Sequence, residues 1–202
     1  MNILFVCTGN TCRSPMAAAL LKNKKPNLHI KSAGIFANEN SAPNRHAVRA
    51  LYEYDIQLSH KSSQVTEDLL NWADLILTMT TNHVQSLILQ YPQFQEKYYT
   101  LKEYALEADN KVWKELQSAY ANIEHKQSQI IQENQLQLDQ LELEKLIIKE
   151  CEEDMLEIKQ LEAQMVDYNI SDPFGGSLEV YEQTLDELYR YINLVIEKIE
   201  KD

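Results

Sequence analysis

The chain opens with a short apolar segment, a polar loop and a helix start. Residues 3–6 are Ile-Leu-Phe-Val, which is typical of a buried β-strand. Ser14 and Pro15 follow the loop, and proline is favoured in the first helical turn because no N–H is needed there. We therefore expect a helix over residues 15–22. Further strands are predicted over 28–32, 75–79 and 98–101, and further helices over 43–54, 66–72, 82–90 and 181–199. This alternation predicts an α/β fold with a parallel four-stranded sheet and helices on both faces.

A second region differs from the rest in charge and in its lack of loop-forming residues. Residues 106–171 hold 15 acidic and 6 basic side chains, while the whole chain has 31 and 19. No glycine lies between Gly34 and Gly175, and no proline lies between Pro92 and Pro173. Because glycine and proline normally mark loops, this region is predicted to be largely helical.

Both ends of the acidic region have to join the α/β part of the chain. We therefore expect residues 106–170 to form an inserted antiparallel helical hairpin that turns near residues 134–139, with arms of roughly 45 Å. The α/β domain then consists of residues 1–105 and 171–202. A heptad-like stripe follows the second arm at Ile148, Cys151, Met155, Ile158 and Met165. The hairpin is interpreted as a docking segment for a protein partner, as a means of self-association, or as a solvated addition without a partner.

Charge and hydropathy exclude several classes of protein. The net charge of -12 argues against nucleic acid or an anionic membrane as the main partner. No apolar run approaches the roughly 18 residues of a membrane span, and the first residues lack the pattern of an export signal. We expect a cytoplasmic protein. Its three cysteines, Cys7, Cys12 and Cys151, are too few and too scattered for a disulfide framework, which favours reactive chemistry.

The loop between the first strand and the first helix has the composition of an anion site. It reads Cys-Thr-Gly-Asn-Thr-Cys-Arg-Ser-Pro over residues 7–15, and Gly9 is expected to ease its turn. Backbone N–H groups and the helix N-terminus that follows attract negative charge. The same donors favour a thiolate at Cys7, and Arg13 offers a planar fork for two phosphoryl oxygens. Ser14 is placed to donate to the sulfur. These features predict phosphate chemistry with a cysteine nucleophile.

A metal site is the alternative for two cysteines that lie five residues apart. Such a site requires further cysteine or histidine ligands at suitable spacing. The five histidines, His29, His46, His60, His83 and His125, show no such cluster in the sequence. We therefore predict no metal and no other cofactor.

Two motifs make the chain resemble the low-molecular-weight protein tyrosine phosphatases. These are the C-x5-R-S loop at Cys7–Ser14 and the later Asp172-Pro173-Phe174, and the resemblance covers residues 1–105 and 171–202. It implies that Cys7 is the nucleophile, that Arg13 binds the phosphoryl group, and that Asp172 is the general acid. The remaining substrate-binding residues that it implies are Thr8, Gly9, Asn10, Thr11, Cys12, Ser14, Phe36 and Phe174.

The resemblance also implies a set of residues that support the loop. Asn10, Ser14, Ser32 and His60 are expected to form a hydrogen-bond network beneath it, with Asn10 in a left-handed conformation that asparagine tolerates. Phe36 is expected to form an aromatic wall of the substrate cleft, opposite Phe174. Core packing is the alternative explanation for either phenylalanine.

The residue at Thr11 indicates the substrate class. Tyrosine-directed members of the family typically carry an apolar residue there, whereas bacterial protein-arginine phosphatases carry threonine. The resemblance is therefore to the arginine-directed branch, and it implies hydrolysis of phosphoarginine on phosphorylated protein substrates through a phosphocysteine intermediate. Cys12 is expected to trap oxidised Cys7 as a disulfide.

Three alternatives remain open at this stage. The first is a tyrosine phosphatase of the same fold. The second is an arsenate reductase, which is disfavoured because Cys151 has no second cysteine near it. The third is an interaction module in which the acidic hairpin binds a basic partner.

Overall fold

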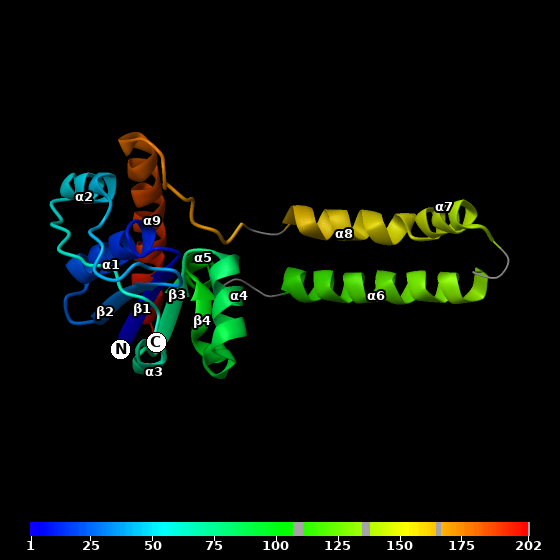
Figure 1. The fold of residues 1–202 in the computed structure, drawn as a ribbon, viewed down its shortest axis with the longest axis horizontal. Coiled ribbons are helices and arrows are strands. Elements are labelled where there is room, and N and C mark those ends of the chain that lie inside the picture. The colour runs from blue at the N-terminus through cyan, green and yellow to red at the C-terminus, as the bar shows by residue number, and fades with distance from the viewer. Residues whose placement is uncertain (107–110, 135–137, 165–166, 202) are drawn as a thin grey trace. The chain divides into compact units, whose positions relative to one another are not determined.

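The computed structural model describes residues 1–106, 111–134, 138–164 and 167–201 (Figure 1). The Cα positions divide into two compact units. Residues Met1–Ala108 and Tyr168–Asp202 form the first unit, and Asp109–Asp167 form the second.

A parallel four-stranded sheet forms the centre of the first unit, as the sequence predicts. The strand order is β2-β1-β3-β4, and all three pairings are parallel. The strands are β1 (Asn2–Cys7), β2 (His29–Gly34), β3 (Leu75–Thr78) and β4 (Tyr98–Thr100). Because β1 lies between β2 and β3, the carboxyl end of β1 is a topological switch point, where ligands bind in open α/β sheets. Cys7 is the last residue of β1.

Helices cover both faces of the sheet, also as predicted. Alternate residues of β1 belong to different cores, with Ile3 and Phe5 on one face and Leu4 and Val6 on the other. The first core is covered by α1 (Arg13–Lys24), α2 (Arg45–Tyr52), α5 (Leu101–Ala105) and α9 (Leu178–Ile199), and the second by α3 (Glu67–Trp72), α4 (Thr81–Gln90) and the 3-10 helix η1 (Pro92–Lys97). The apolar side chains of β1 are fully buried on both faces, which fixes the position of the loop that follows it.

Two short elements were missed by the sequence prediction. Helix α5 begins at Leu101, where the expected strand over 98–101 was to end, and η1 precedes β4. The cause of the early strand end is a capping box: Thr100 accepts a hydrogen bond from the Glu103 N–H, and Glu103 accepts one from the Thr100 N–H. These bonds satisfy free N–H groups of the first turn and start the helix.

The described residues of the second unit form three helices. They are α6 (Lys111–Asn134), α7 (Gln140–Glu150) and α8 (Glu152–Gln164), with a core of Ala119, Ile123, Cys151, Ile158 and Leu161. Lys126 pairs with Asp154 at 2.6 Å. Helix α6 packs against α8, and the returning arm is divided at Cys151. Of the predicted turn, residues 135–137 lie outside the described residues.

The predicted heptad stripe does not form one face. Cys151 and Ile158 are buried, but Ile148 is 62% and Met155 53% exposed. Ile147 packs against the core instead of Ile148. Since neighbouring residues are about 100° apart around a helix, Ile148 points well away from the buried seam. Met165 lies outside the described residues.

No helix among residues 1–106, 111–134, 138–164 and 167–201 combines the length and the apolar character needed to cross a membrane.

Candidate active site

Asn10 shapes the loop between β1 and α1. Its backbone has φ of 54°, in the left-handed region that asparagine tolerates better than most residues, and its side chain is fully buried. The side-chain nitrogen donates to Ser14 Oγ and to Ser32 Oγ, both at 2.9 Å. The side-chain oxygen accepts from the Ser63 N–H at 2.9 Å. One amide therefore joins α1, β2 and the segment around Ser63 beneath the loop.

His60 holds the same residue by its backbone. Its Nε2 lies 2.8 Å from the Asn10 carbonyl oxygen. Burial lowers the pKa of His60 below its ordinary value, although the hydrogen bond to Asn10 acts in the opposite direction. The neutral ring can donate from Nε2 to this carbonyl. Asn10, Ser14, Ser32 and His60 thus come together in the structure.

The sulfur of Cys7 faces two donors. The N–H of Asn10 donates to Sγ at 3.3 Å, and Ser14 Oγ lies 3.0 Å from Sγ. Ser14 Oγ accepts from the Asn10 amide, and its one hydroxyl hydrogen can be donated to the sulfur or to the Ala33 carbonyl oxygen, which lies 3.3 Å away. Donors directed at the sulfur stabilise a thiolate relative to a thiol.

Gly34 allows β2 to approach the loop, whereas Gly9 has no comparable role. A Cβ at Gly34 would lie 2.6 Å from the Thr8 carbonyl oxygen and 2.9 Å from the Asn10 nitrogen. At Gly9 the nearest atom would be 3.8 Å away, and φ is not positive. The expectation that Gly9 eases the turn was wrong, because Asn10 supplies the left-handed residue.

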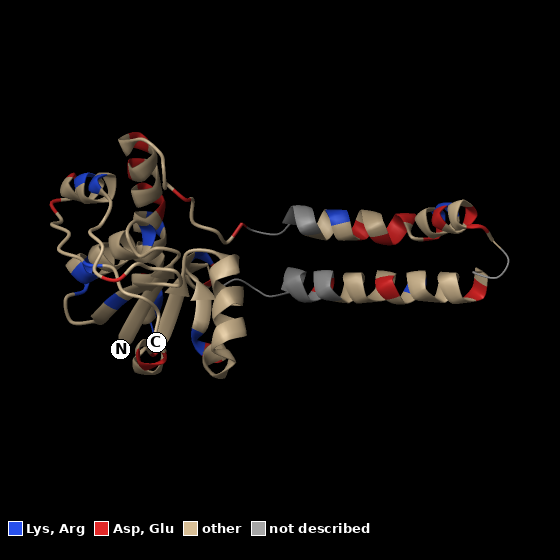
Figure 2. Ribbon diagram, in the orientation of Figure 1, with Lys and Arg blue, Asp and Glu red and all other residues tan. Residues whose placement is uncertain are grey.

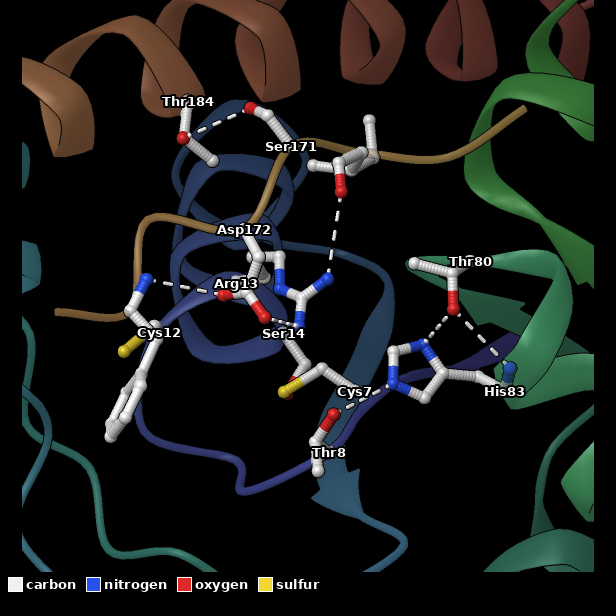
Figure 3. A network of polar contacts seen from close by, with 12 residues as sticks. Cys7, Thr8, Cys12, Arg13, Ser14, Thr80, His83, Ser171, Asp172 and Thr184 are labelled. Carbon is white, nitrogen blue, oxygen red and sulfur yellow. Dashed lines mark hydrogen bonds and ion pairs between the residues drawn. The ribbon is translucent and has the colours of Figure 1, made fainter. Parts of the chain in front are cut away.

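Arg13 and Asp172 meet above the loop (Figure 3). Arg13 Nη2 lies 2.6 Å from Asp172 Oδ2. The arginine side chain is 6% exposed and that of the aspartate 53%. Asp172 Oδ1 also accepts from the Phe174 N–H at 3.2 Å. In this state the carboxylate occupies the guanidinium edge that an anion would require.

The segment before Asp172 is fixed to the first unit by several hydrogen bonds. The N–H of Ile170 donates to the Met79 carbonyl at 2.8 Å, and the Ser171 N–H and hydroxyl both donate to Glu187. Burial acts to raise the pKa of Glu187, but the bonds from Lys102 and Ser171 outweigh it and lower the pKa. Asp172 therefore follows an anchored segment.

The loop encloses a cavity of about 250 Å³. Its lining contains the three predicted catalytic residues and most of the predicted substrate-binding ones, namely Cys7, Thr8, Gly9, Thr11, Cys12, Arg13, Asp172 and Phe174. Asn10 and Ser14 were also predicted to bind substrate, but they do not line it, because their side chains are used in the network behind the loop.

An adjoining cavity of about 460 Å³ shares Thr8, Arg13 and Asp172 with the first. Phe36 lines this second cavity, whereas Phe174 lines the first. Phe36 and Phe174 are 68% and 77% exposed, so neither belongs to the core. Each of the two cavities is thus lined by one exposed aromatic side chain.

His83 was missed by the sequence prediction. It is buried, and its Nε2 lies 2.9 Å from Thr8 Oγ1 while its Nδ1 lies 2.8 Å from Thr80 Oγ1 (Figure 3). Burial, followed by the nearby positive charge of Arg13, lowers the pKa of His83 to about 4. A neutral imidazole carries one donor and one acceptor, so it can link the two hydroxyls. The available signal was its place after the strand next to β1, at the same sheet edge as the loop.

Cys12 contacts a second residue that the sequence did not indicate, Tyr181. The Cys12 sulfur lies 3.3 Å from the Tyr181 hydroxyl, and both side chains are buried. Burial raises the pKa of the Cys12 thiol. Cys7 and Cys12 are both free, and the disulfide between them stays a prediction. Across the described part of the chain, no group of three or more His, Cys, Asp or Glu side chains is arranged to hold a metal ion.

The sequence is similar to known phosphatases. A family profile described as "Low molecular weight phosphotyrosine protein phosphatase" matches residues 2–152. The protein-arginine-phosphatase of Bacillus subtilis (strain 168) is 33% identical over 206 residues, which cover 100% of this chain and 99% of that protein. The low molecular weight protein-tyrosine-phosphatase PtpB of Staphylococcus aureus is 43% identical over 108 residues, 54% of this chain and 76% of the relative.

A solved structure is similar over the whole chain. It is a variant of the YwlE arginine phosphatase in which serine replaces the active-site cysteine and is phosphorylated. Its TM-score is 0.69 at 33% identity, with 100% of this chain and 97% of that chain covered.

The space around Gly34 and Gly9 predicts that substitution by alanine changes the free energy of unfolding at Gly34 but hardly at Gly9. Gly34→Ala should lower the free energy of unfolding by about 1–3 kcal/mol, because its Cβ overlaps backbone atoms of the loop. Gly9→Ala is the matched control and should change it by less than about 1 kcal/mol. Urea unfolding of both variants measures the difference. Equal destabilisation would contradict the role given to Gly34.

The burial of neutral His83 predicts a specific pH dependence. Its pKa is about 4 in the folded protein and ordinarily 6.5, so between these values the unfolded chain binds a proton that the folded chain does not. Stability therefore falls as the pH decreases from 7 to 5, by about 2 kcal/mol from this group. His83→Gln should remove that part of the pH dependence, measured by urea unfolding at both pH values. His29→Gln, at an exposed position, should retain it. An unchanged pH dependence in the His83 variant would contradict the assignment.

Proposed function

Because the chain belongs to the low molecular weight phosphotyrosine protein phosphatase family and is a cysteine-dependent protein phosphatase, we propose that it hydrolyses phosphoarginine side chains on proteins. Residues 1–105 and 171–202 are proposed to form the catalytic domain, with residues 106–170 as an inserted helical segment. All the residues with a proposed chemical role belong to the catalytic domain.

Cys7 is proposed as the nucleophile. Its thiolate attacks the phosphorus in line, an S–P bond forms, and the P–N bond to the arginine side chain breaks. The leaving nitrogen takes a proton from Asp172, and the product is a phosphocysteine with a free arginine side chain. Support comes from the two donors at the Cys7 sulfur and from the cavity that Cys7 shares with Asp172.

Arg13 is proposed to exchange partners when substrate binds. In the free protein it pairs with Asp172 at 2.6 Å, and the loop places the Asn10 N–H at the Cys7 sulfur. A phosphoryl group carries more negative charge than one carboxylate and accepts from both Nη atoms, so it can displace Asp172. The released carboxylate takes up a proton from solvent and faces the leaving group, which is where a general acid is required.

The second step returns the enzyme to its starting state. Asp172, now deprotonated, accepts a proton from water as the oxygen attacks phosphorus. The S–P bond breaks, inorganic phosphate leaves, and the Cys7 thiolate is restored. Ser14 assists by donating to the departing sulfur. Arg13 and the loop N–H groups stabilise the phosphoryl oxygens in both steps.

Thr11 is the residue proposed to set the preference for phosphoarginine. Its side chain lines the cavity beside Cys7, where a hydroxyl can bond to polar atoms of a guanidinium group and an apolar side chain cannot. The carboxylate of Asp172 also suits a cationic leaving group. The relative that covers the whole chain, at 33% identity, is named a protein-arginine phosphatase.

Phosphotyrosine is the second candidate substrate. The observation that favours it is the 43% identity to the tyrosine phosphatase PtpB over 108 residues. The exposed rings of Phe36 and Phe174 also offer stacking surfaces for a phenyl group.

Substrate preference provides the direct test. We expect kcat/KM for a phosphoarginine peptide to exceed that for the matching phosphotyrosine peptide. Thr11→Ile should lower the ratio of the two by at least about tenfold, since it removes the polar contact. Preference for phosphotyrosine in the parent protein would move the function to tyrosine dephosphorylation.

The role of Asp172 as a general acid can be tested separately from phosphate binding. Asp172→Asn should lower kcat by about 100- to 10,000-fold, because amide nitrogen cannot transfer the proton. Inorganic phosphate should inhibit this variant at least as well as the parent, because no carboxylate then competes for Arg13. Cys7→Ser should abolish turnover. Weakened phosphate inhibition in Asp172→Asn would show that Asp172 supports binding and would contradict the exchange proposed for Arg13.

A further inference from the structure

His83 is buried at the edge of the active site and takes no part in the two chemical steps. The sheet fixes its position. Strand β3 runs beside β1 with Thr78 in register with Val6, and the N–H of Met79 donates to the Val6 carbonyl at 3.0 Å. The chain then enters α4, so His83 is held next to the loop by the same strand pair that carries Cys7.

The contacts of Thr80 favour one tautomer of His83. Thr80 caps α4, and its Oγ1 accepts from the His83 backbone N–H at 3.3 Å. The same oxygen lies 2.8 Å from His83 Nδ1, to which it can donate its hydroxyl hydrogen. A neutral imidazole carries one donor and one acceptor, so an accepting Nδ1 leaves the proton on Nε2. Nε2 then donates to Thr8 Oγ1 at 2.9 Å.

The surroundings of His83 keep its ring neutral. Helix α4 carries no Lys, Arg, Asp or Glu, as Figure 2 shows. In the lining of the adjoining cavity, the charged residues are Arg13 and Asp172. Burial and then the positive charge of Arg13 lower the pKa of His83 to about 4, although Asp172 acts in the opposite direction. A neutral ring donates from one nitrogen only, which gives its bond to Thr8 a single direction.

A donor at Thr8 Oγ1 leaves the hydroxyl hydrogen of Thr8 for another partner. Thr8 is exposed and lines both cavities, together with Arg13 and Asp172. A phosphoryl group that is bound by Arg13 and attacked by Cys7 lies in the cavity that these residues share. Because the guanidinium group of Arg13 bonds two phosphoryl oxygens, a further strong acceptor faces the rest of the lining.

We propose that His83 is a positioning residue that directs the Thr8 hydroxyl to the substrate. Its Nε2 donates to Thr8 Oγ1 and thereby turns the hydroxyl hydrogen toward a phosphoryl oxygen, which accepts it. The inference rests on the proposed binding of a phosphoryl group beside Cys7 and Arg13, and it holds for either candidate substrate. The hydroxyl adds an uncharged donor to the loop, and bonds to an ionised phosphoryl oxygen are stronger than those between neutral groups.

The tautomer can be measured on the unmodified protein. In a nitrogen–proton correlation NMR spectrum of the histidine rings at neutral pH, protonated and unprotonated ring nitrogens have different chemical shifts. We expect the proton of His83 on Nε2. The His83 signals are identified as those missing from the spectrum of His83→Gln. A proton on Nδ1 would overturn the proposal, because Thr8 would then donate to the ring and have no hydrogen for the substrate.

Two substitutions of Thr8 test the effect of its hydroxyl. Thr8→Val keeps the branched shape and removes the hydroxyl, so the Ki of inorganic phosphate should rise at least about tenfold. The kcat/KM for a small aryl phosphate should fall by a similar factor. Thr8→Ser retains a hydroxyl and should recover most of both losses. Phosphate inhibition that is unchanged in Thr8→Val would contradict the proposal.

Two amide variants separate the ring nitrogens of His83. Glutamine can place its amide nitrogen near the position of Nε2, whereas asparagine places it near Nδ1. His83→Asn should lower kcat/KM for the aryl phosphate by about three- to tenfold, and His83→Gln should recover most of this loss. In a protein that already carries Thr8→Val, His83→Asn should change kcat/KM by less than about twofold, since the group it acts through is absent.

Controls separate positioning from folding and from substrate choice. His29→Gln, at an exposed position, should change neither kcat/KM nor the Ki of phosphate. If His83→Asn lowers kcat/KM equally in the parent and in Thr8→Val, the role of His83 is only structural and the proposal is wrong. Preference of the parent for phosphotyrosine would leave the proposal intact, because these assays use an aryl phosphate and inorganic phosphate. Turnover that survives Cys7→Ser would instead contradict the proposed function.

Discussion

The buried side chain of Asn10 is the contact on which the site depends. Its left-handed backbone turns the loop, while its amide bonds to Ser14 and Ser32 and to the backbone of Ser63. The same residue donates its own N–H to the Cys7 sulfur. Removing the amide would leave several buried partners unsatisfied, each at about 1–3 kcal/mol. The shape of the loop and the hydrogen bond to the Cys7 sulfur therefore have one structural cause.

The pair of Arg13 and Asp172 neutralises the charge at the centre of the site. In the free protein the buried guanidinium is neutralised by a half-exposed carboxylate, which avoids an unpaired buried charge. In the exchange proposed above for Arg13, a phosphoryl group takes the place of Asp172, and the released Asp172 is the proposed acid. The hydrogen bonds of Ile170 and Ser171 limit how far the acid moves in this exchange. Under that proposal, substrate binding and release of the acid are one event.

How well the sequence predicted each part of the site depends on how far apart along the chain the interacting residues are. Cys7 and Arg13 lie in one short motif between a strand and a helix, so local patterns located them, and the family resemblance added Asp172. His83 is 75 residues from Thr8, and no local pattern links the two. Gly34 matters only because β2 pairs with β1. The heptad-like stripe predicted that this segment is helical, but it did not predict which face is buried. Ile147 packs against the core where the stripe predicted Ile148, and a shift of one residue turns a different side of the helix inward.

The chain enters and leaves the helical unit at one end of its helix pair. Helices α6 and α8 pack together in opposite directions, with Lys126 against Asp154 and Ile123 in one core with Ile158. The first residues of α6 and the last residues of α8 are thus at the same end of the hairpin. If residues 106–170 are an insertion, as proposed, ends that lie together limit the strain on the other unit, and the entropic cost of loop closure rises only slowly with length. The contacts that position Asp172, to Met79 and Glu187, belong entirely to the other unit.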